Sequence, residues 1–306
     1  MRILIIGAAG QLGSTLMTRL ASLGTVIGTD RAALDLRELG NIPTALSRMQ
    51  PELILNAAAY TSVDAAEEEP DLAQLVNRDA PAAIAHWAAE NGRPLIHFST
   101  DYVFDGSGKV PWSETDTPSP LSVYGSSKLG GEKAVRGAGG DFLIVRTSWV
   151  YASKGKNFLG TIARLARDRT ELRIVADQTG APTSTLVIAD ALRTILKGGA
   201  DRFRDLAFEA QGIVHLTAYG AASWHQFGTK IVEGLIARGV PLRTRHITAI
   251  SSDEYGARAA RPKNSLLSLE RLRDVFGISP THWTIALESE LDELARNMRP
   301  DDGSTH

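Results

Sequence analysis

A turn of three glycines directly after a short apolar segment is the feature that most constrains this chain. Residues 2–6 form a run that is apolar after Arg2 and rich in isoleucine, without alternation, which predicts a strand buried on both faces of a parallel sheet. Gly7, Gly10 and Gly13 follow at once, and an amphipathic helix is expected from there to about residue 22. A strand, a glycine turn and a helix in this order predict a dinucleotide site.

Each glycine has a physical role in such a turn. Gly7 allows the tight turn, Gly10 lets the backbone approach a pyrophosphate, and Gly13 lets the helix pack close to the sheet. The start of the helix, with Gln11 and Leu12 in its first turn, then offers unpaired N–H groups and a favourable dipole to the phosphates. A turn that merely joins a strand to a helix is the alternative, and this context argues against it.

Two charged residues follow the next expected strand, residues 26–28, and bear on the choice of dinucleotide. Asp30 lies 17 residues after Gly13, where an acid accepts hydrogen bonds from the adenine ribose, and this favours NAD. Arg31 is placed to pair with the 2′-phosphate of NADP. NADPH and NADH therefore both stay open as cofactors.

Redox chemistry is indicated by Tyr124 and Lys128, which are four residues apart and so share one face of a helix. We expect the ammonium to lower the pKa of the phenol, so that Tyr124 exchanges a proton near neutral pH, as reduction of a ketone requires. A hydroxyl of Ser99 or Thr100 would hold the reacting oxygen. By itself the pair is weak evidence, and an ordinary surface helix is the alternative.

The rest of the chain alternates strands and helices. Further strands are expected at 53–56, 95–98, 142–145 and 213–216, and helices at 71–91, 157–168, 186–196, 224–238 and 283–298. This order predicts an α/β fold, a doubly wound parallel (Rossmann) sheet with a smaller, mixed α/β C-terminal substrate lobe. We expect residues 1–150 to form the dinucleotide domain, with about 184–217 returning to it. Residues 151–183 and 218–306 then form the substrate lobe.

Composition narrows the possible partners and sites. A net charge of −2 over 306 residues argues against nucleic acid as a partner, and no apolar run is long enough to cross a membrane. The absence of cysteine excludes disulfides and thiolate ligands, and the seven histidines show no metal spacing. We expect a cytoplasmic protein without a structural metal, in which His97, His215 and His246 are core or edge residues and not ligands.

Three features carry a family resemblance together with the glycine turn: residues 56–59 (NAAA), residues 99–106 (STDYVFDG) and the Tyr124/Lys128 pair. With them the chain resembles the extended short-chain dehydrogenase/reductases that act on nucleotide sugars. Residues 146–151 (RTSWVY), 156–158 (KNF), 177–183 (DQTGAPT) and 261–265 (RPKNS) are similar to the dTDP-4-dehydrorhamnose reductases of that superfamily. The resemblance covers nearly the whole chain.

The resemblance implies an activity and a set of roles. The activity is reduction of the C4 ketone of dTDP-4-dehydro-6-deoxy-L-lyxo-hexose by NADPH or NADH. Tyr124 would protonate the C4 oxygen, Lys128 would hold the nicotinamide ribose and Thr100 would orient the substrate. Besides the glycine turn, Asp30 and Arg31, the expected cofactor contacts are Asp35, Leu36, Ala57, Ala58, Ala59, Tyr60, Thr61, Ser99, Tyr124 and Lys128. The expected substrate contacts are Thr100, Asp101, Trp149, Asn157, Gln178 and Arg261.

Other activities of related chains can be weighed by residue. Sugar-nucleotide dehydratases need a second acid after Asp101, and here Tyr102 follows, which argues against dehydration. An epimerase stays open, because it needs the same Tyr, Lys and hydroxyl. A non-catalytic subunit, like the regulatory subunit of methionine adenosyltransferase, has no need of them. The resemblance implies a magnesium ion that bridges a dimer in some family members through a glutamate, but Thr15 stands at that position, which argues against it here. A monomer or a metal-free homodimer therefore stays open beside the metal-bridged dimer.

Overall fold

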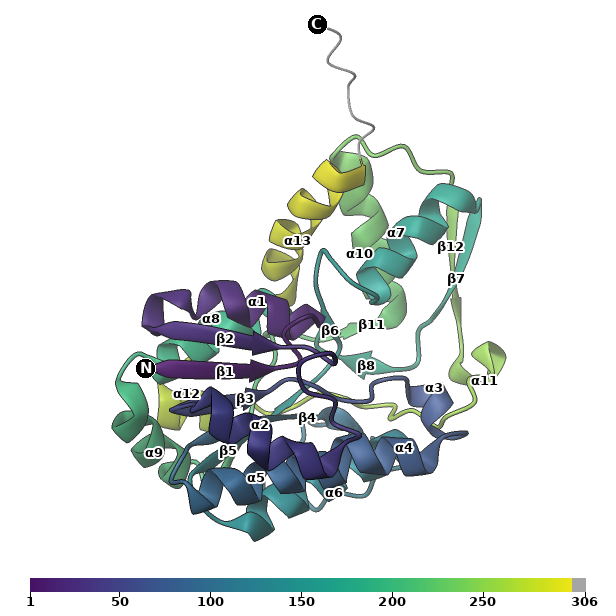
Figure 1. The fold of residues 1–306 in the computed structure, drawn as a ribbon. Coiled ribbons are helices and arrows are strands. Elements are labelled where there is room, and N and C mark those ends of the chain that lie inside the picture. Colours follow the sequence, from purple (N-terminus) through teal and green to yellow (C-terminus); the bar gives the residue numbers. More distant parts are fainter. Residues whose placement is uncertain (299–306) are drawn as a thin grey trace, which may run out of the picture.

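The structure, a computed structural model, describes residues 1–298. Its main body is a parallel sheet between two layers of helices, and a second lobe stands above the carboxyl end of the sheet (Figure 1). Within the described range, no helix combines the length and the apolar character that crossing a membrane requires.

Six parallel strands build the sheet, in the spatial order β2-β1-β3-β4-β5-β10. The predicted doubly wound sheet is confirmed, and the order reverses between β1 and β3, where such folds bind ligands. The strands are β1 (Arg2–Ile6), β2 (Thr25–Thr29), β3 (Leu53–Asn56), β4 (Leu95–Thr100), β5 (Phe142–Thr147) and β10 (Ile213–His215).

Alternate residues of the strands face the two helix layers, because side chains alternate along a strand. Ile3 and Ile5 of β1 face the layer made by α1 (Gln11–Arg19), α8 (Thr185–Leu196), α9 (Gly199–Glu209) and α12 (Glu270–Phe276). Leu4 and Ile6 face α2 (Ile42–Met49), α5 (Ala80–Glu90) and α6 (Val123–Ala138). Both layers are apolar, so the strands are buried on both sides.

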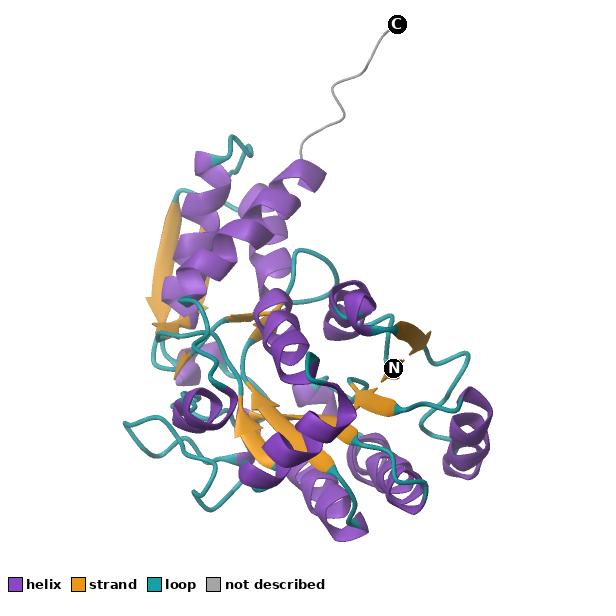
Figure 2. Ribbon diagram, turned by 90° about the vertical axis from the view of Figure 1, so that its left-hand side faces the viewer, coloured by secondary structure: helices purple, strands orange, loops and turns teal. Residues whose placement is uncertain are grey.

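The second lobe packs three helices and a two-stranded parallel ribbon around Phe227 (Figure 2). Its elements are α7 (Phe158–Asp168), α10 (Trp224–Ala237), α13 (Trp283–Met298), β7 (Glu171–Val175) and β12 (His246–Ile250). Two short strand pairs lie between the lobes, β6 (Val150–Tyr151) with β9 (Thr183–Ser184) and β8 (Thr179–Gly180) with β11 (Ala222–Ser223). The division of the chain into lobes stays a prediction, and its residues 299–306 lie outside the described residues.

The smaller elements lie mostly near the carboxyl end of the sheet. They are α3 (Val63–Ala66), α4 (Pro70–Gln74), α11 (Ser252–Tyr255), the 3₁₀ turns η1 (Ala21–Leu23), η2 (Leu39–Asn41) and η4 (Asp101–Val103), and the π-helical segment η3 (Leu75–Asp79). The helix predicted at 71–91 is therefore interrupted by η3. Helices α2, α9 and α12 and strand β12 were not predicted from the sequence.

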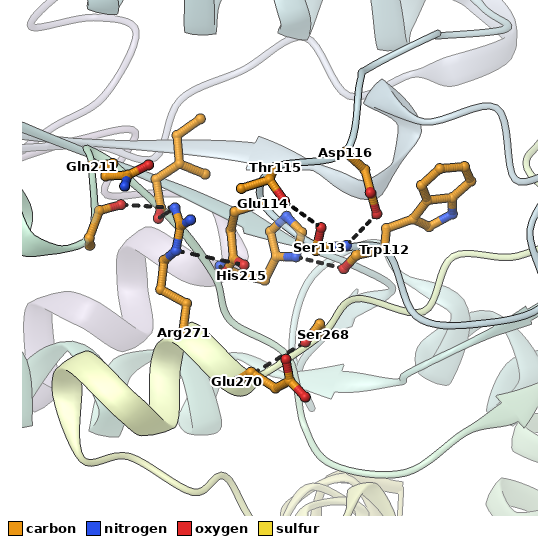
Figure 3. Close-up of polar contacts among 12 residues, drawn as sticks. Trp112, Ser113, Glu114, Thr115, Asp116, Gln211, His215, Ser268, Glu270 and Arg271 are labelled. Carbon is orange, nitrogen blue, oxygen red and sulfur yellow. Dashed lines mark hydrogen bonds and ion pairs between the residues drawn. The ribbon is translucent and has the colours of Figure 1, made fainter.

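A polar cluster anchors the long loop between η4 and α6 (Figure 3). The buried Glu114 carboxylate accepts the backbone N–H of His215 at 2.9 Å, and His215 Nδ1 lies 3.1 Å from the carbonyl oxygen of Trp112. Arg271 of α12 lies 3.9 Å from the same carboxylate. The ring of Trp112 stacks on Phe104 with centroids 4.7 Å apart. These contacts tie the loop to the end of β10, beside the edge where η4 begins.

Candidate active site

The glycine turn has the close contacts that the sequence predicts. Gly7 has φ +83°, and a side chain there would meet the backbone of Ala58 at 2.8 Å. A side chain at Gly13 would lie 2.1 Å from the carbonyl oxygen of Gly7. A side chain at Gly10 would have one neighbour within 4 Å, the carbonyl oxygen of Gly7 at 3.2 Å. Helix α1 thus packs tightly on the strand, while the backbone at Gly10 stays accessible.

The residues present fit a dinucleotide. No side chain caps the N-terminus of α1, where the first N–H groups of a helix have no intrahelical acceptor. Among the residues that the structure describes, the buried hydroxyls of Thr29 and Ser99 have no hydrogen-bond partner. Thr29 ends β2 and Ser99 lies near the end of β4, both at the carboxyl edge of the sheet. Uncapped N–H groups and unpaired hydroxyls along one edge are what a phosphate and a ribose require.

The segment after β2 is organised by two carboxylates. Asp30 accepts the N–H groups of Ala32 and Ala33, both at 3.0 Å through Oδ1. Asp35 binds Arg37 at 2.5 Å, and this hydrogen bond lowers the pKa of Asp35 to about 2. Leu36 is buried in the apolar layer beneath, and the exposed Arg31 lies 3.6 Å from Asp35. The adenosine contacts expected of Asp30, Arg31, Asp35 and Leu36 stay predictions.

Asn77 holds the segment after β3 against α6, the helix that carries Tyr124. The sequence analysis did not identify Asn77 as a site residue. Its Oδ1 accepts the N–H of Tyr60 at 2.8 Å, and its Nδ2 donates to the Tyr60 carbonyl at 3.0 Å and to Ser127 Oγ at 2.9 Å. The fully buried Asn77 lies in η3, where the π geometry brings it inward. Residue types alone give no signal for a π segment, so an uninterrupted helix was expected.

The remaining residues predicted for the cofactor after β3 lie along the same segment. Ala58 N–H donates to Asn56 Oδ1 at 3.3 Å, and Ala57 continues the backbone pairing of β3 with β1. Tyr60 reaches outward, and its hydroxyl donates to Glu69 at 2.5 Å. Ala59 is half-buried and Thr61 is exposed at the surface. Their contacts with a cofactor stay predictions.

Thr100 and Tyr124 are brought together at the carboxyl end of β4. Thr100 Oγ1 donates to Asp101 Oδ1 at 3.0 Å. The same hydroxyl lies beside the phenol of Tyr124 and lowers its pKa, although burial outweighs this effect. Helix α6 can approach this closely because residue 125 is glycine. A side chain there would lie 2.2 Å from the carbonyl oxygen of Tyr102. Ser122 caps the helix by accepting the N–H of Gly125.

Burial dominates the electrostatics of this group. It raises the pKa of Tyr124 to about 12 and that of Asp101 to about 6, and it lowers the pKa of Lys128 to about 8. The expected lowering of the phenol pKa is therefore wrong for this structure. The amine of Lys128 lies 3.5 Å from His97 Nε2, so it is directed at His97, and desolvation of the phenolate outweighs its charge.

An ion pair lies in the interior between α6 and β5. Arg146 donates to both carboxylate oxygens of Glu132, at 2.8 and 2.7 Å, and both side chains are 3% exposed. The guanidinium also lies 5.1 Å from the ring centroid of Phe104. Glu132 is one turn after Lys128 and raises the pKa of that amine. The pair joins the helix that carries Tyr124 to the sheet.

Aromatic side chains from the second lobe line the far side of the junction. Trp149 has φ +47° and stacks on Trp224, with ring centroids 3.6 Å apart. A side chain at Gly180 would lie 2.4 Å from the Trp149 ring, so glycine is required there. The amide of Gln178 accepts from Trp224 Nε1 at 3.1 Å and donates to Ser252 at 2.9 Å. Trp149 and Gln178 thus belong to one packed unit.

Arg261 is already paired in this structure. It donates to Asp64 Oδ2 at 2.7 Å, and this hydrogen bond lowers the pKa of Asp64. Asp64 lies in α3 of the main body, whereas Arg261 lies in the loop that returns from the second lobe. The cation expected at the diphosphate end therefore lies at the junction with a carboxylate beside it.

Asn157 lies at the glycine turn. Its Nδ2 donates to Gln11 Oε1 at 2.8 Å and to the Ala152 carbonyl at 2.7 Å, and its Oδ1 accepts the N–H of Gly160 to cap α7. Gln11 Nε2 in turn donates to the Lys156 carbonyl at 3.1 Å. The contact joins the second lobe to the cofactor turn. A role of Asn157 in substrate binding stays a prediction.

Thr15, which occupies the position of the magnesium-binding glutamate of some family members, contacts another helix through its hydroxyl. Thr15 Oγ1 lies 2.9 Å from the hydroxyl of Thr185 on α8. Across residues 1–298, no group of three or more His, Cys, Asp or Glu side chains gathers as a metal site would require. Of the three histidines predicted as core or edge residues, His97 and His215 are fully buried, whereas His246 is exposed at the start of β12 in the two-stranded ribbon.

Comparison with known proteins gives a consistent family. The model of the family described as "RmlD substrate binding domain" matches residues 1–296. The dTDP-4-dehydrorhamnose reductase of Burkholderia thailandensis is 43% identical over 94% of this chain and 97% of its own length. The dTDP-4-dehydrorhamnose reductase of Escherichia coli K12 is 40% identical over 96% of this chain and 98% of its own length. The crystal structure of the Bacillus anthracis reductase in complex with NADP is 32% identical, covers 95% of this chain and 99% of that one, and has a TM-score of 0.85.

Proposed function

The chain belongs to the RmlD substrate binding domain family, and on that premise we propose that it is a dTDP-4-dehydrorhamnose reductase. It reduces the C4 ketone of dTDP-4-dehydro-6-deoxy-L-lyxo-hexose, that is dTDP-4-dehydro-β-L-rhamnose, to dTDP-L-rhamnose with NADPH or NADH. The observation that supports the reaction chemistry is the approach of the Tyr124 phenol to Thr100, at the edge of the sheet where the glycine turn also lies.

Proton transfer falls to Tyr124. A bound reduced nicotinamide supplies the hydride that C4 receives. Because the pKa of Tyr124 is about 12, its phenol carries a proton at neutral pH and acts as the acid that protonates the C4 oxygen. Thr100, whose hydroxyl lies beside the phenol, orients the ketone oxygen. Lys128 lies on the same helix face, holds the nicotinamide ribose and takes part in returning a proton to Tyr124.

The remaining residues divide between the two ligands. Gly7, Gly10 and Gly13, with the first turn of α1, hold the pyrophosphate, and Asp30 and Arg31 take the adenine ribose. The segment after β3 and Ser99 line the nicotinamide half. Asp101, Trp149, Gln178 and Arg261 face the sugar nucleotide, and Arg261 does so by exchanging Asp64 for a phosphate. The protein acts in the cytoplasm as a monomer or a metal-free homodimer.

Absorbance of NADPH tests the proposal. The purified protein is mixed with dTDP-4-dehydro-6-deoxy-L-lyxo-hexose, and substrate-dependent oxidation is expected. Tyr124→Phe should lower kcat by about 10²- to 10⁴-fold, since the general acid is lost, while the affinity for NADPH measured by fluorescence stays near that of the parent. Tyr151→Phe, which removes a buried tyrosine hydroxyl without a partner, is the matched control.

Two results would overturn the assignment. Turnover that survives in Tyr124→Phe excludes this phenol as the acid. Binding of NADPH with no substrate-dependent oxidation in the parent protein would instead favour the non-catalytic subunit.

A further inference from the structure

Three buried polar side chains form a chain of contacts behind the reacting groups. Asn56 Nδ2 lies 3.3 Å from His97 Nδ1, and His97 Nε2 lies 3.5 Å from Lys128 Nζ. Their exposed fractions are 1%, 0% and 2%, so none of the three exchanges contacts with bulk water. The chain runs from the end of β3, through β4, to the face of α6 that also carries Tyr124.

The backbone sets the direction of the hydrogens in this chain. Ala58 N–H donates to Asn56 Oδ1 at 3.3 Å, which turns the NH₂ group of the same amide toward His97. Nδ1 of His97 must then accept, and the hydrogen of a neutral imidazole is carried by Nε2. Desolvation lowers the pKa of His97 well below its usual value, so the ring is neutral. Its Nε2–H therefore faces the amine of Lys128.

We propose that His97 is a positioning residue for Lys128, held by Asn56 in the tautomer whose Nε2–H faces the lysine nitrogen. An N–H donor beside an ammonium gives no hydrogen bond, whereas the lone pair of a neutral amine accepts one. The arrangement thus favours the amine over the ammonium and keeps the lysine ready to exchange a proton near neutral pH. This inference rests on the reduction proposed above.

A glycine on α6 leaves room for this contact. A side chain at Gly131, three residues after Lys128, would lie 3.3 Å from His97 Nε2 and 2.2 Å from the Asn77 carbonyl oxygen. Glycine there lets the ring reach the helix face. The other charged or titratable groups around Lys128 are Tyr124 and Glu132 on α6, Asp101 on η4 and Arg146 on β5, which is bound by Glu132.

The tautomer is read directly by nitrogen NMR. Protein labelled with ¹⁵N-histidine is measured at neutral pH, and the His97 signals are assigned by their loss in His97→Gln. A protonated Nε2 and an unprotonated Nδ1 are expected. In Asn56→Asp the carboxylate accepts from Nδ1–H, so the two nitrogens should exchange their states. A parent protein with Nδ1–H overturns the proposal.

The second readout is the pH dependence of kcat/KM. In Asn56→Asp, Nε2 of His97 becomes an acceptor for the ammonium of Lys128 and stabilises it. The limb of the pH profile that reports the pKa of Lys128 should therefore move to higher pH by about one unit. His97→Gln, whose amide reaches the lysine, should move it the same way, and His97→Asn, which reaches only Asn56, should lower kcat more. His215→Gln, another buried neutral histidine that does not contact the lysine, should leave the limb in place.

The outcomes separate the two proposals. A parent enzyme that turns over the sugar nucleotide, with an unmoved limb in Asn56→Asp, overturns the role of His97 alone. A parent protein without turnover overturns the proposed function, and the NMR measurement still reports the tautomer.

Discussion

Replacing Glu132 by Gln removes one charge of the ion pair between α6 and β5 and leaves the Arg146 guanidinium alone in the interior. The two side chains have nearly the same volume, so the change is electrostatic. Both partners are 3% exposed and joined by two hydrogen bonds, so neither charge can recover its hydration locally. Removing one partner of such a buried pair costs about 3–5 kcal/mol.

Thermal unfolding measures this cost. For a chain of this size, each kcal/mol lowers Tm by about 2–4 °C, so Glu132→Gln should lower Tm by roughly 6–20 °C. The control is Glu233→Gln, which breaks an exposed pair with Lys230 whose partners are each 55% exposed. Such a surface pair contributes no more than about 1 kcal/mol. Replacing both buried partners, as in Glu132→Leu with Arg146→Met, should recover most of the loss.

Activity gives a second, independent readout of the same change. Glu132 raises the pKa of Lys128, so its removal should move the pH limb that reports this lysine to lower pH. A loss of Tm no larger than that of Glu233→Gln would refute the claim that the pair is desolvated. An unmoved pH limb in a stable variant would refute its influence on Lys128.

Three further changes follow from the packing. Asn77→Ala removes three hydrogen bonds and leaves the part-buried backbone N–H of Tyr60 without its acceptor, so it should lower stability by about 2–4 kcal/mol in urea unfolding and raise KM for NADPH. Asp101→Asn should stabilise the fold at neutral pH, because burial raises the pKa of the Asp101 carboxyl in the folded protein to about 6. The parent protein should lose stability relative to the variant as pH rises from about 4 to 6, and the two should be equally stable below about pH 4. Gly13→Ala should abolish NADPH binding in titration, because its methyl group would overlap the Gly7 carbonyl, whereas Gly137→Ala, with open space around it in α6, should raise stability by about 0.5–1 kcal/mol.

The sequence predicts those parts of the site that depend on local geometry. The glycine turn requires close backbone approach, and the close contacts of Gly7 and Gly13 are visible in the residue types. The spacing of Tyr124 and Lys128 follows from the helix period alone. The strands of the sheet could likewise be located from the sequence, because each is a short apolar run.

Contacts between distant segments could not be predicted. Asn77 is brought to Tyr60 by a π segment, and His97 reaches Lys128 across a strand and a helix, so neither pairing leaves a sequence pattern. The raised pKa of Tyr124 has the same origin, because desolvation depends on everything that packs around the phenol. Nor does the sequence show that Asn157 bonds to the glycine turn.

If Arg261 binds the diphosphate as proposed, the Asp64–Arg261 pair makes that recognition an exchange of anions. An anion that binds Arg261 must first displace a carboxylate held at 2.7 Å, so only the difference between the two partners contributes to affinity. A ligand with one dispersed charge gains little from this swap, whereas two adjacent phosphates bring more charge than the aspartate they replace. In that proposal the pair selects for ligands of high charge density, and Asp64, already half exposed, is hydrated when Arg261 leaves it.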